Sequence, residues 1–225
     1  MPTSILESWA ANAEQWMQLI QQELIQSRAV TNPAIVDWVG SFPPMHICDM
    51  GCGEGWLSRA LIEKGHQLTG IDGTLALVEH ARQFEGHYAQ LSYEAIAAGA
   101  SIPNAPFDAM VFNFSLYEDH LTEQLLRQLA NSLTGPRFIF IQTIHPSYHQ
   151  KAGIDKADHW FPNAWAGLPG SFSHPHPWYF RTMESWQQLF ESTDYQLIDY
   201  KEPKKAEQDA PASIIFRITP KNGLR

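Results

Sequence analysis

Apolar residues near the N-terminus follow a helical period. They recur three or four positions apart: Trp9, Ala13, Trp16, Ile20 and Leu24. This spacing predicts an amphipathic helix. A second helix is expected to begin at Asn32-Pro33, because asparagine is a frequent cap and proline suits the first turn of a helix. Phe42-Pro43-Pro44 should end it, so residues 1–44 are predicted to form an N-terminal helical cap.

From residue 45 onward, short apolar runs alternate with helical patterns. The runs predict strands at 46–50, 67–71, 87–91, 107–114 and 137–144. The segments between them predict helices at 55–64, 74–84, 93–98 and 122–133. Regular alternation of this kind implies a parallel sheet with helices on both faces and right-handed crossovers.

The C-terminal part has a different pattern. A helix is predicted at 182–191 and strands at 195–200 and 213–219. Only a linker joins these two strands, and a parallel pair would need a longer crossover, so they should be antiparallel. The prediction is a doubly wound α/β domain over 1–225, with a seven-stranded, mostly parallel sheet and an antiparallel C-terminal strand. Its parts are the cap, a core at 45–144, an insertion at 145–181 and a C-terminal unit at 182–225.

Composition narrows the class of protein. With 225 residues, 44% of them apolar, the chain can form one substantial core. The net charge of −9 argues against a nucleic-acid partner held through its phosphates. No apolar run reaches membrane length, and no basic residue precedes Arg28, so neither a membrane partner nor a secretory signal is expected. Cys48 and Cys52 are then expected to be reduced thiols of a cytoplasmic protein.

A glycine-rich turn marks the candidate ligand site. Residues 47–56 read ICDMGCGEGW, a short apolar run that leads into three glycines at alternate positions, Gly51, Gly53 and Gly55. Glycine lets a backbone turn sharply and approach a ligand closely. Asp72 follows at the end of the next apolar run. Strand, glycine turn, helix, strand and acid are the order of a nucleotide-binding half-fold, in which the acid accepts hydrogen bonds from ribose hydroxyls.

The glycine spacing separates two kinds of nucleotide site. Sites for NAD read G-x-G-x-x-G and face a pyrophosphate. Here the spacing is G-x-G-x-G, and Trp56 stands where the third glycine of that pattern would fall. An NAD(P)-dependent oxidoreductase is therefore the weaker alternative. A catalytically silent binding protein with the same fold also remains open.

The segment DMGCGEG, residues 49–55, resembles motif I of the class I S-adenosylmethionine (SAM)-dependent methyltransferases. Asp72, the Ser92-Tyr93-Glu94 segment and the strand at 107–114 follow in that family's order. The resemblance covers about residues 47–219 and is greatest to small-molecule methyltransferases of the ubiquinone-biosynthesis type. It implies a Rossmann-like methyltransferase fold, SAM as cofactor with S-adenosylhomocysteine (SAH) as product, and a small-molecule methyl acceptor. There are two departures: Thr134-Gly135-Pro136 replaces a Gly-Gly turn, and Ser92 stands where an acid often contacts adenine.

The resemblance also assigns roles to residues. Gly51, Cys52 and Gly53 would contact the methionine part of SAM, and Asp72 the ribose. Ser92 and Tyr93 would flank the adenine, and Asn113 would lie beneath the methionine moiety. Arg28 follows an N-terminal helix that often folds over the cofactor, and its guanidinium could bind the SAM carboxylate. The ordinary alternatives are a solvated turn acid for Asp72, turn hydrogen bonds for Asn113 and a surface arginine for Arg28.

The segment 145–181 is expected to be a long connection without regular structure, which is usually functional. It holds five of the ten histidines and many aromatic residues. It leaves the sheet next to the expected methyl, so it should form the acceptor pocket, with Trp178, Tyr179 and Tyr117 in contact with the acceptor. His145 at the strand tip is the predicted base, with a packed or capping histidine as the alternative. His174-Pro-His176 lacks a zinc-binding spacing, so no metal is expected. Acceptor identity and oligomeric state stay open.

Overall fold

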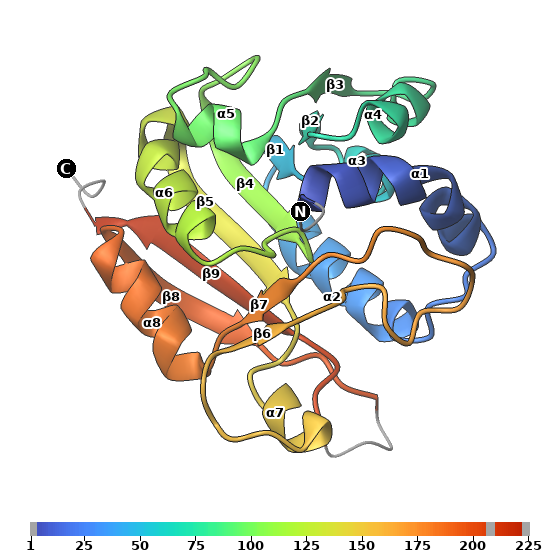
Figure 1. Cartoon of the computed structure of the whole chain (residues 1–225). Coiled ribbons are helices and arrows are strands. Elements are labelled where there is room, and N and C mark those ends of the chain that lie inside the picture. Colours follow the sequence, from blue (N-terminus) through green and yellow to red (C-terminus); the bar gives the residue numbers. More distant parts are fainter. Residues whose placement is uncertain (1–3, 206–209, 222–225) are drawn as a thin grey trace.

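A computed structural model of the protein describes residues 4–205 and 210–221 (Figure 1). Its main sheet has seven strands in the order β3-β2-β1-β4-β5-β9-β8. Their bounds are β1 His46–Met50, β2 Gln67–Asp72, β3 His87–Gln90, β4 Phe107–Asn113, β5 Leu133–Thr143, β8 Tyr195–Lys201 and β9 Ile214–Pro220. Strands β1 to β5 are parallel, and β9 is antiparallel to both β5 and β8. This confirms the predicted mostly parallel sheet with its antiparallel C-terminal strand.

Helices cover both faces of the sheet (Figure 1). On one face, α2 (Arg28–Gly40) and α3 (Trp56–Glu63) bury apolar residues against β1, β4 and β5. On the other face, α5 (Tyr93–Ala97), α6 (His120–Leu129) and α8 (Met183–Ser192) do the same. Because both faces are covered, the central strands are almost wholly buried, which explains why they read as continuous apolar runs.

The strand order reverses at the centre of the sheet. β1 lies between β2 and β4, so the connections that leave β1 and β4 run to opposite sides. Parallel α/β sheets bind ligands in the crevice outside the carboxyl ends of the strands at such a point. The glycine turn leaves β1 at this position, and Asp72 ends the neighbouring strand β2.

The N-terminal helix α1 (Ile5–Gln21) lies against α4 (Leu75–Ala81), near the carboxyl ends of the strands (Figure 1). Ser4 and Glu7 form a capping box at its start, which satisfies two backbone N–H groups. The Leu6 side chain occupies the space that a Cβ on Gly73 would need. Among the residues described, no helix has both the length and the apolar character needed to cross a membrane.

Three predictions of local structure were wrong. Strand β5 begins at Leu133 instead of residue 137, so Thr134-Gly135-Pro136 lies within the strand and not in a turn before it. Helix α2 begins at Arg28, four residues before Asn32, because the Ser27 carbonyl already accepts hydrogen bonds from Val30 and Thr31. Pro33 therefore lies inside the helix. The segment 145–181 is not irregular throughout. It contains helix α7 (Tyr148–Ala152), and strands β6 (His159–Phe161) and β7 (Trp178–Phe180) pair in it as an antiparallel ribbon.

Candidate functional site

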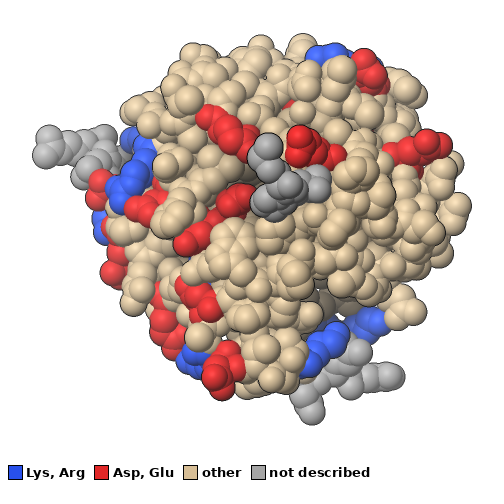
Figure 2. Space-filling view, viewed as in Figure 1, with Lys and Arg blue, Asp and Glu red and all other residues tan. Residues whose placement is uncertain are grey.

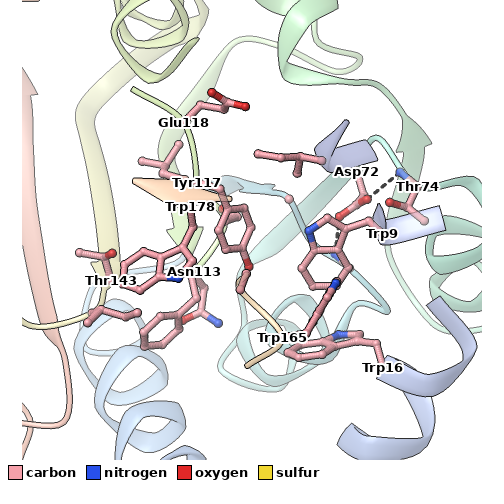
Figure 3. Close-up of a pocket in the computed structure, with 18 of the residues that line it drawn as sticks. Trp9, Trp16, Asp72, Thr74, Asn113, Tyr117, Glu118, Thr143, Trp165 and Trp178 are labelled. Atoms are coloured by element: carbon pink, nitrogen blue, oxygen red, sulfur yellow. Dashed lines mark hydrogen bonds between the residues drawn. The ribbon is translucent and has the colours of Figure 1, made fainter. Parts of the chain in front are cut away.

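A cavity of about 530 Å³ lies at the carboxyl ends of the central strands (Figure 3). Its floor includes Gly51 after β1, Asp72 at the end of β2, Asn113 at the end of β4 and Thr143 at the end of β5. Helix α1 and the segment 145–181 contribute to its walls. The volume is in the range of small-molecule sites, which are typically about 300–1,000 Å³.

The glycine turn needs its glycines for two different reasons. Gly51, Gly53 and Gly55 all have positive φ, at 71°, 56° and 86°, where side chains other than glycine are strained. A Cβ on Gly51 would lie 2.6 Å from the Ser115 Cβ and 2.7 Å from the Tyr93 hydroxyl oxygen. A Cβ on Gly53 would meet no atom within 4 Å. The backbone at Gly51 is therefore closely packed, whereas Gly53 faces open space beside the cavity.

Asp72 joins the end of β2 to the glycine turn. Its Oδ2 accepts a hydrogen bond from the Gly53 N–H at 2.9 Å, and its Oδ1 accepts one from the Thr74 N–H at 2.7 Å (Figure 3). Burial raises the pKa of the Asp72 carboxyl, and these two donors oppose that rise. Each carboxylate oxygen has a second lone pair, so Asp72 can also accept hydrogen bonds from ligand hydroxyls.

Asp49 is a second buried acid below the turn. Its side chain is 2% exposed, and its Oδ2 accepts a hydrogen bond from the Ser58 hydroxyl at 2.8 Å. Burial raises its pKa from 3.8 to about 7; Asp72 and Glu54 add to the rise, whereas the Ser58 bond opposes it. The folded protein therefore holds this proton more tightly than the unfolded chain does.

This proton predicts a pH-dependent effect on stability. Asp49 ionises near pH 4 in the unfolded chain and near pH 7 in the folded protein. The stability that the bound Asp49 proton contributes is thus fully present below pH 4 and is lost as the pH rises towards 7. Asp49→Asn cannot ionise, so its free energy of unfolding relative to wild type should rise by up to about 1.4 kcal/mol per pH unit over that window. Urea unfolding at several pH values measures this, and a pH-independent difference would contradict it. Asp37→Asn, at an exposed acid, is the control.

Ser92, Tyr93 and Asn113 line the same cavity. The Ser92 hydroxyl accepts a hydrogen bond from the Ala95 N–H and so caps α5. The Tyr93 hydroxyl donates to the Ser115 Oγ at 3.0 Å, which places it next to the glycine turn. The Asn113 Oδ1 is buried and, among the described residues, has no hydrogen-bond partner. A buried acceptor without a partner is costly, so a ligand donor there would stabilise the site.

Arg28 and Cys52 reach the cavity in different ways. The Arg28 guanidinium lies 4.6 Å above the Trp56 ring centre, and its burial lowers its pKa. It is the one cation among the described residues that line the cavity. The Cys52 side chain packs with Val78, Ala81 and Tyr88. Only the backbone of Cys52 is therefore placed to meet a ligand.

Aromatic side chains line two sides of the cavity. We call six of them the aromatic wall: Trp9, Trp16, Tyr117, Phe161, Trp165 and Trp178. The Trp9 and Trp165 ring centres are 4.6 Å apart, and Phe161 stacks on Trp178 at 4.5 Å. Figure 3 shows Trp9, Trp16 and Trp165 on one side of the cavity, and Tyr117 and Trp178 on the other. These rings come from α1, the loop after β4 and the segment 145–181.

The structure contradicts the prediction that His145 is the base. Its Nδ1 lies 2.7 Å from the Ser147 Oγ and its Nε2 lies 2.9 Å from a Glu202 carboxylate oxygen. Both ring nitrogens are thus engaged outside the cavity, and His145 does not line it. The other four histidines of the segment 145–181 do not line it either. Tyr117, Trp178 and Tyr179 do line it, as expected for acceptor contacts, although the Tyr179 hydroxyl also donates to Asp158.

A buried polar network joins α1 to the segment 163–176, which run side by side in Figure 1. The Trp165 Nε1 donates to the Ser8 Oγ at 2.8 Å, and the Ser173 N–H donates to the Asn12 Oδ1 at 2.8 Å. Ser8 and Asn12 are almost completely buried. The Asn12 Nδ2 also donates to the Ser8 carbonyl. These hydrogen bonds therefore link α1 to the segment 163–176, and both of these elements cover the cavity.

Breaking this network should destabilise the packing of α1 against the segment 163–176. Asn12→Ala leaves the Ser173 N–H without its acceptor, which typically costs about 1–3 kcal/mol. We expect a lower free energy of unfolding in urea and faster tryptophan quenching by iodide, because Trp9 and Trp165 lie beside the network. Gln18→Ala on the exposed side of α1 is the control and should behave as wild type. Equal behaviour of the two variants would show that the network does not hold the covering in place.

Sequence reasoning did not assign several lining residues to the site. Glu118 and Thr143 line the cavity but were given no role, and Tyr148 and Phe161 were predicted there only as part of the segment 145–181. Thr143 could have been found from its position at a strand tip. Trp9 and Trp16 were predicted only as part of the apolar stripe of the N-terminal helix. Among the described residues, no group of three His, Cys, Asp or Glu side chains is arranged to hold a metal ion.

Comparisons with known proteins agree with this geometry. A family model described as a methyltransferase domain matches residues 13–200. A ubiquinone biosynthesis O-methyltransferase of Stutzerimonas stutzeri (strain A1501) is 38% identical over 78 residues, which are 31% of this chain and 34% of that protein. A cypemycin N-terminal methyltransferase of Streptomyces sp is 26% identical over 152 residues, or 62% of this chain and 60% of that protein. The chain thus spans between 34% and 60% of the length of these two curated relatives.

The fold also matches solved structures. A SAM-dependent methyltransferase from Clostridium acetobutylicum ATCC 824 superposes with a TM-score of 0.66 at 13% identity. The match covers 93% of this chain and 99% of that one. At this identity the likeness shows a shared fold.

Proposed function

The chain belongs to the methyltransferase domain family, and from this premise we propose that it transfers a methyl group from SAM to a small-molecule acceptor. One observation carries the proposal: the glycine turn and Asp72 share a single cavity with the aromatic wall. A ligand held by the turn would thus lie beside a second ligand held by the rings. Methyl transfer needs two such neighbours, because it is an in-line displacement between them.

The residues of the turn fit this cofactor. Gly53 leaves open space where a side chain would otherwise project. Asp72 keeps lone pairs for ribose hydroxyls, and the unpartnered Asn113 Oδ1 can accept from a ligand donor. We assign the backbone of Gly51, Cys52 and Gly53 to the methionine part. Two further assignments remain proposals: Ser92 and Tyr93 beside the adenine, and Arg28 at the carboxylate.

When bound, SAM supplies a methyl group on a positively charged sulfur. The protein's own part is to align the two reactants and to exclude water. Asp72 places a carboxylate beside the turn, which favours a cationic ligand there. The aromatic wall offers contact area to a flat acceptor. Since no histidine or lysine lines the described cavity, alignment by these groups is the main contribution we assign to the chain.

A cavity of small-molecule size and an acidic surface support a small acceptor over a nucleic acid. Acidic side chains outnumber basic ones on the face in Figure 2, in keeping with the net charge of −9. A nucleic-acid partner would instead need a basic surface. We also propose a cytoplasmic location, which the two buried free thiols of Cys48 and Cys52 support.

The acceptor atom is not decided by the relatives. One is named as an O-methyltransferase and the other as an N-terminal methyltransferase, so both oxygen and nitrogen occur among similar proteins. The acceptor must be sought in the cavity itself.

Calorimetry with SAM, SAH and NAD tests the proposal. We expect SAM and SAH to bind in the micromolar range or tighter, and NAD not to bind. Binding of NAD without SAM would instead support an oxidoreductase. A screen for SAH release with pooled small molecules then separates an enzyme from a silent binding protein. Binding of SAM with no turnover of any pool would favour the silent protein.

A further inference from the structure

Two carboxylates in the cavity have no role in the cofactor assignment. Glu118, in the loop between β4 and α6, and Glu94, on α5, both line the cavity. The three other acids of the cavity belong to the glycine turn or to the ends of β1 and β2. Figure 3 shows Glu118 on the side of the cavity away from Trp16, close to the Tyr117 side of the aromatic wall. The part of the cavity that we assign to the acceptor is thus acidic as well as aromatic.

The Glu118 carboxylate is available to a ligand. Among the described residues it forms no side-chain hydrogen bond or ion pair, although its side chain is partly buried. The neighbouring Asp119 is different, because its Oδ1 pairs with Arg181 at 2.7 Å. Burial raises the pKa of the Glu118 carboxyl, and the charges of Glu94 and Asp119 raise it further. A positive charge placed beside Glu118 would relieve both effects.

Among the described residues that line the cavity, no cation pairs with Glu118, although the neighbouring His120 lowers the pKa of its carboxyl. Arg28, the one cation among the described lining residues, stacks on Trp56 and lies in the field of Glu54. An anionic ligand in the part of the cavity that we assign to the acceptor would meet Glu118 and Glu94 without a compensating cation. An ammonium would meet carboxylates and also the faces of electron-rich rings, which attract cations.

We propose that the methyl acceptor carries a positively charged amine on a planar frame, with Glu118 binding the amine and the aromatic wall binding the frame. This inference rests on the proposed function and narrows its substrate class. The wall supplies stacked and edge-on rings on both sides of the cavity, which suits a flat ring system. Glu118 then acts as a specificity-determining residue for the charge of the acceptor.

Three matched probes test the inference on the full-length protein saturated with SAH. Tryptamine, tryptophol and indole-3-propionate share the indole ring and differ in charge. By calorimetry, tryptamine should bind roughly 10-fold more tightly than tryptophol, the size of effect expected for a partly desolvated cation beside rings and a carboxylate. Indole-3-propionate should bind more weakly than tryptophol. Equal binding, preference for the neutral or anionic probe, or no binding of any probe would overturn the inference.

Two variants locate the preference. Glu118→Gln should weaken tryptamine binding by roughly 10-fold while leaving the affinities for tryptophol and SAH near wild type. Glu123→Gln on α6 makes the same change of net charge at an exposed carboxylate that pairs with Arg127, and it should leave the preference intact. If both variants weaken tryptamine equally, the preference comes from overall charge and the assignment to Glu118 is wrong. Failure of SAH itself to bind would instead count against the proposed function.

Discussion

Replacing Gly51 with alanine is expected to cost about 2–5 kcal/mol of folding stability and to abolish measurable cofactor binding. Two effects add. An alanine at φ 71° is strained, at about 1–2 kcal/mol. Its Cβ would also lie 2.6 Å from the Ser115 Cβ, and overpacking of this kind costs about 1–3 kcal/mol. Moving the turn to relieve the clash would displace the Gly53 backbone from the cavity. Urea unfolding and SAH calorimetry measure the two losses.

Gly153→Ala is the matched control for this substitution. Gly153 has φ 67°, almost the same as Gly51, but a Cβ there would meet no atom within 4 Å. It lies at the end of α7 and does not line the cavity. Backbone strain alone should lower the folding stability of Gly153→Ala, by about 1–2 kcal/mol, and its SAH affinity should be unchanged. Similar losses of stability and binding in both variants would show that close packing at Gly51 has no special importance.

The second large effect is expected at Asp72. Asp72→Ala should weaken SAH binding by about 1.5–3 kcal/mol, the usual loss for hydrogen bonds to a charged group, or roughly 10- to 150-fold in Kd. The carboxylate has two tasks: it holds the Gly53 and Thr74 N–H groups, and it is proposed to bind the ribose. Asp72→Asn should therefore retain part of the affinity, because an amide oxygen can still accept one of these bonds. Calorimetry on all three proteins measures the series.

Asp37→Ala controls for the loss of one negative charge. Asp37 is exposed on α2, lies 3.6 Å from the Lys64 Nζ and does not line the cavity. The Asp37→Ala variant should bind SAH as wild type does. Unchanged affinity in Asp72→Ala, with circular dichroism showing a folded protein, would remove Asp72 from the cofactor site.

Much of the fold was predictable because it depends on local pattern. The apolar runs at 46–50 and 107–114 are buried on both faces, and burial of this kind selects apolar residues one after another along the strand. The antiparallel arrangement of β8 and β9 followed from the absence of a helix between them. The sequence also predicted Gly51, Gly53 and Asp72 at the carboxyl ends of the strands, where they line the cavity, since their backbone geometry and order are local properties. Their role in cofactor binding stays a prediction.

Other features were not predicted, either because local hydrogen bonds overrode a helix-start preference or because they depend on contacts between distant segments. The end of α2 nearest the cavity begins at Arg28 because of hydrogen bonds to the Ser27 carbonyl, which outweigh the preference of Asn32-Pro33 for a helix start. His145 was expected at the reaction centre from its position at a strand tip. Its ring instead turns towards Ser147 and Glu202, a residue 57 positions away. No local pattern specifies such a partner.

The sequence by itself determined the parallel sheet, the glycine turn and the acid that faces it, because each follows from periodicity or from the backbone freedom of particular residues. Only the tertiary structure decided what closes the cavity and what charge it carries. Ser8 and Asn12 meet the segment 163–176 across more than 150 residues, and the charge of Glu94 on α5 acts on Glu118. These features arise from side chains that folding brings together, and the spacing of those residues along the chain does not predict the contacts.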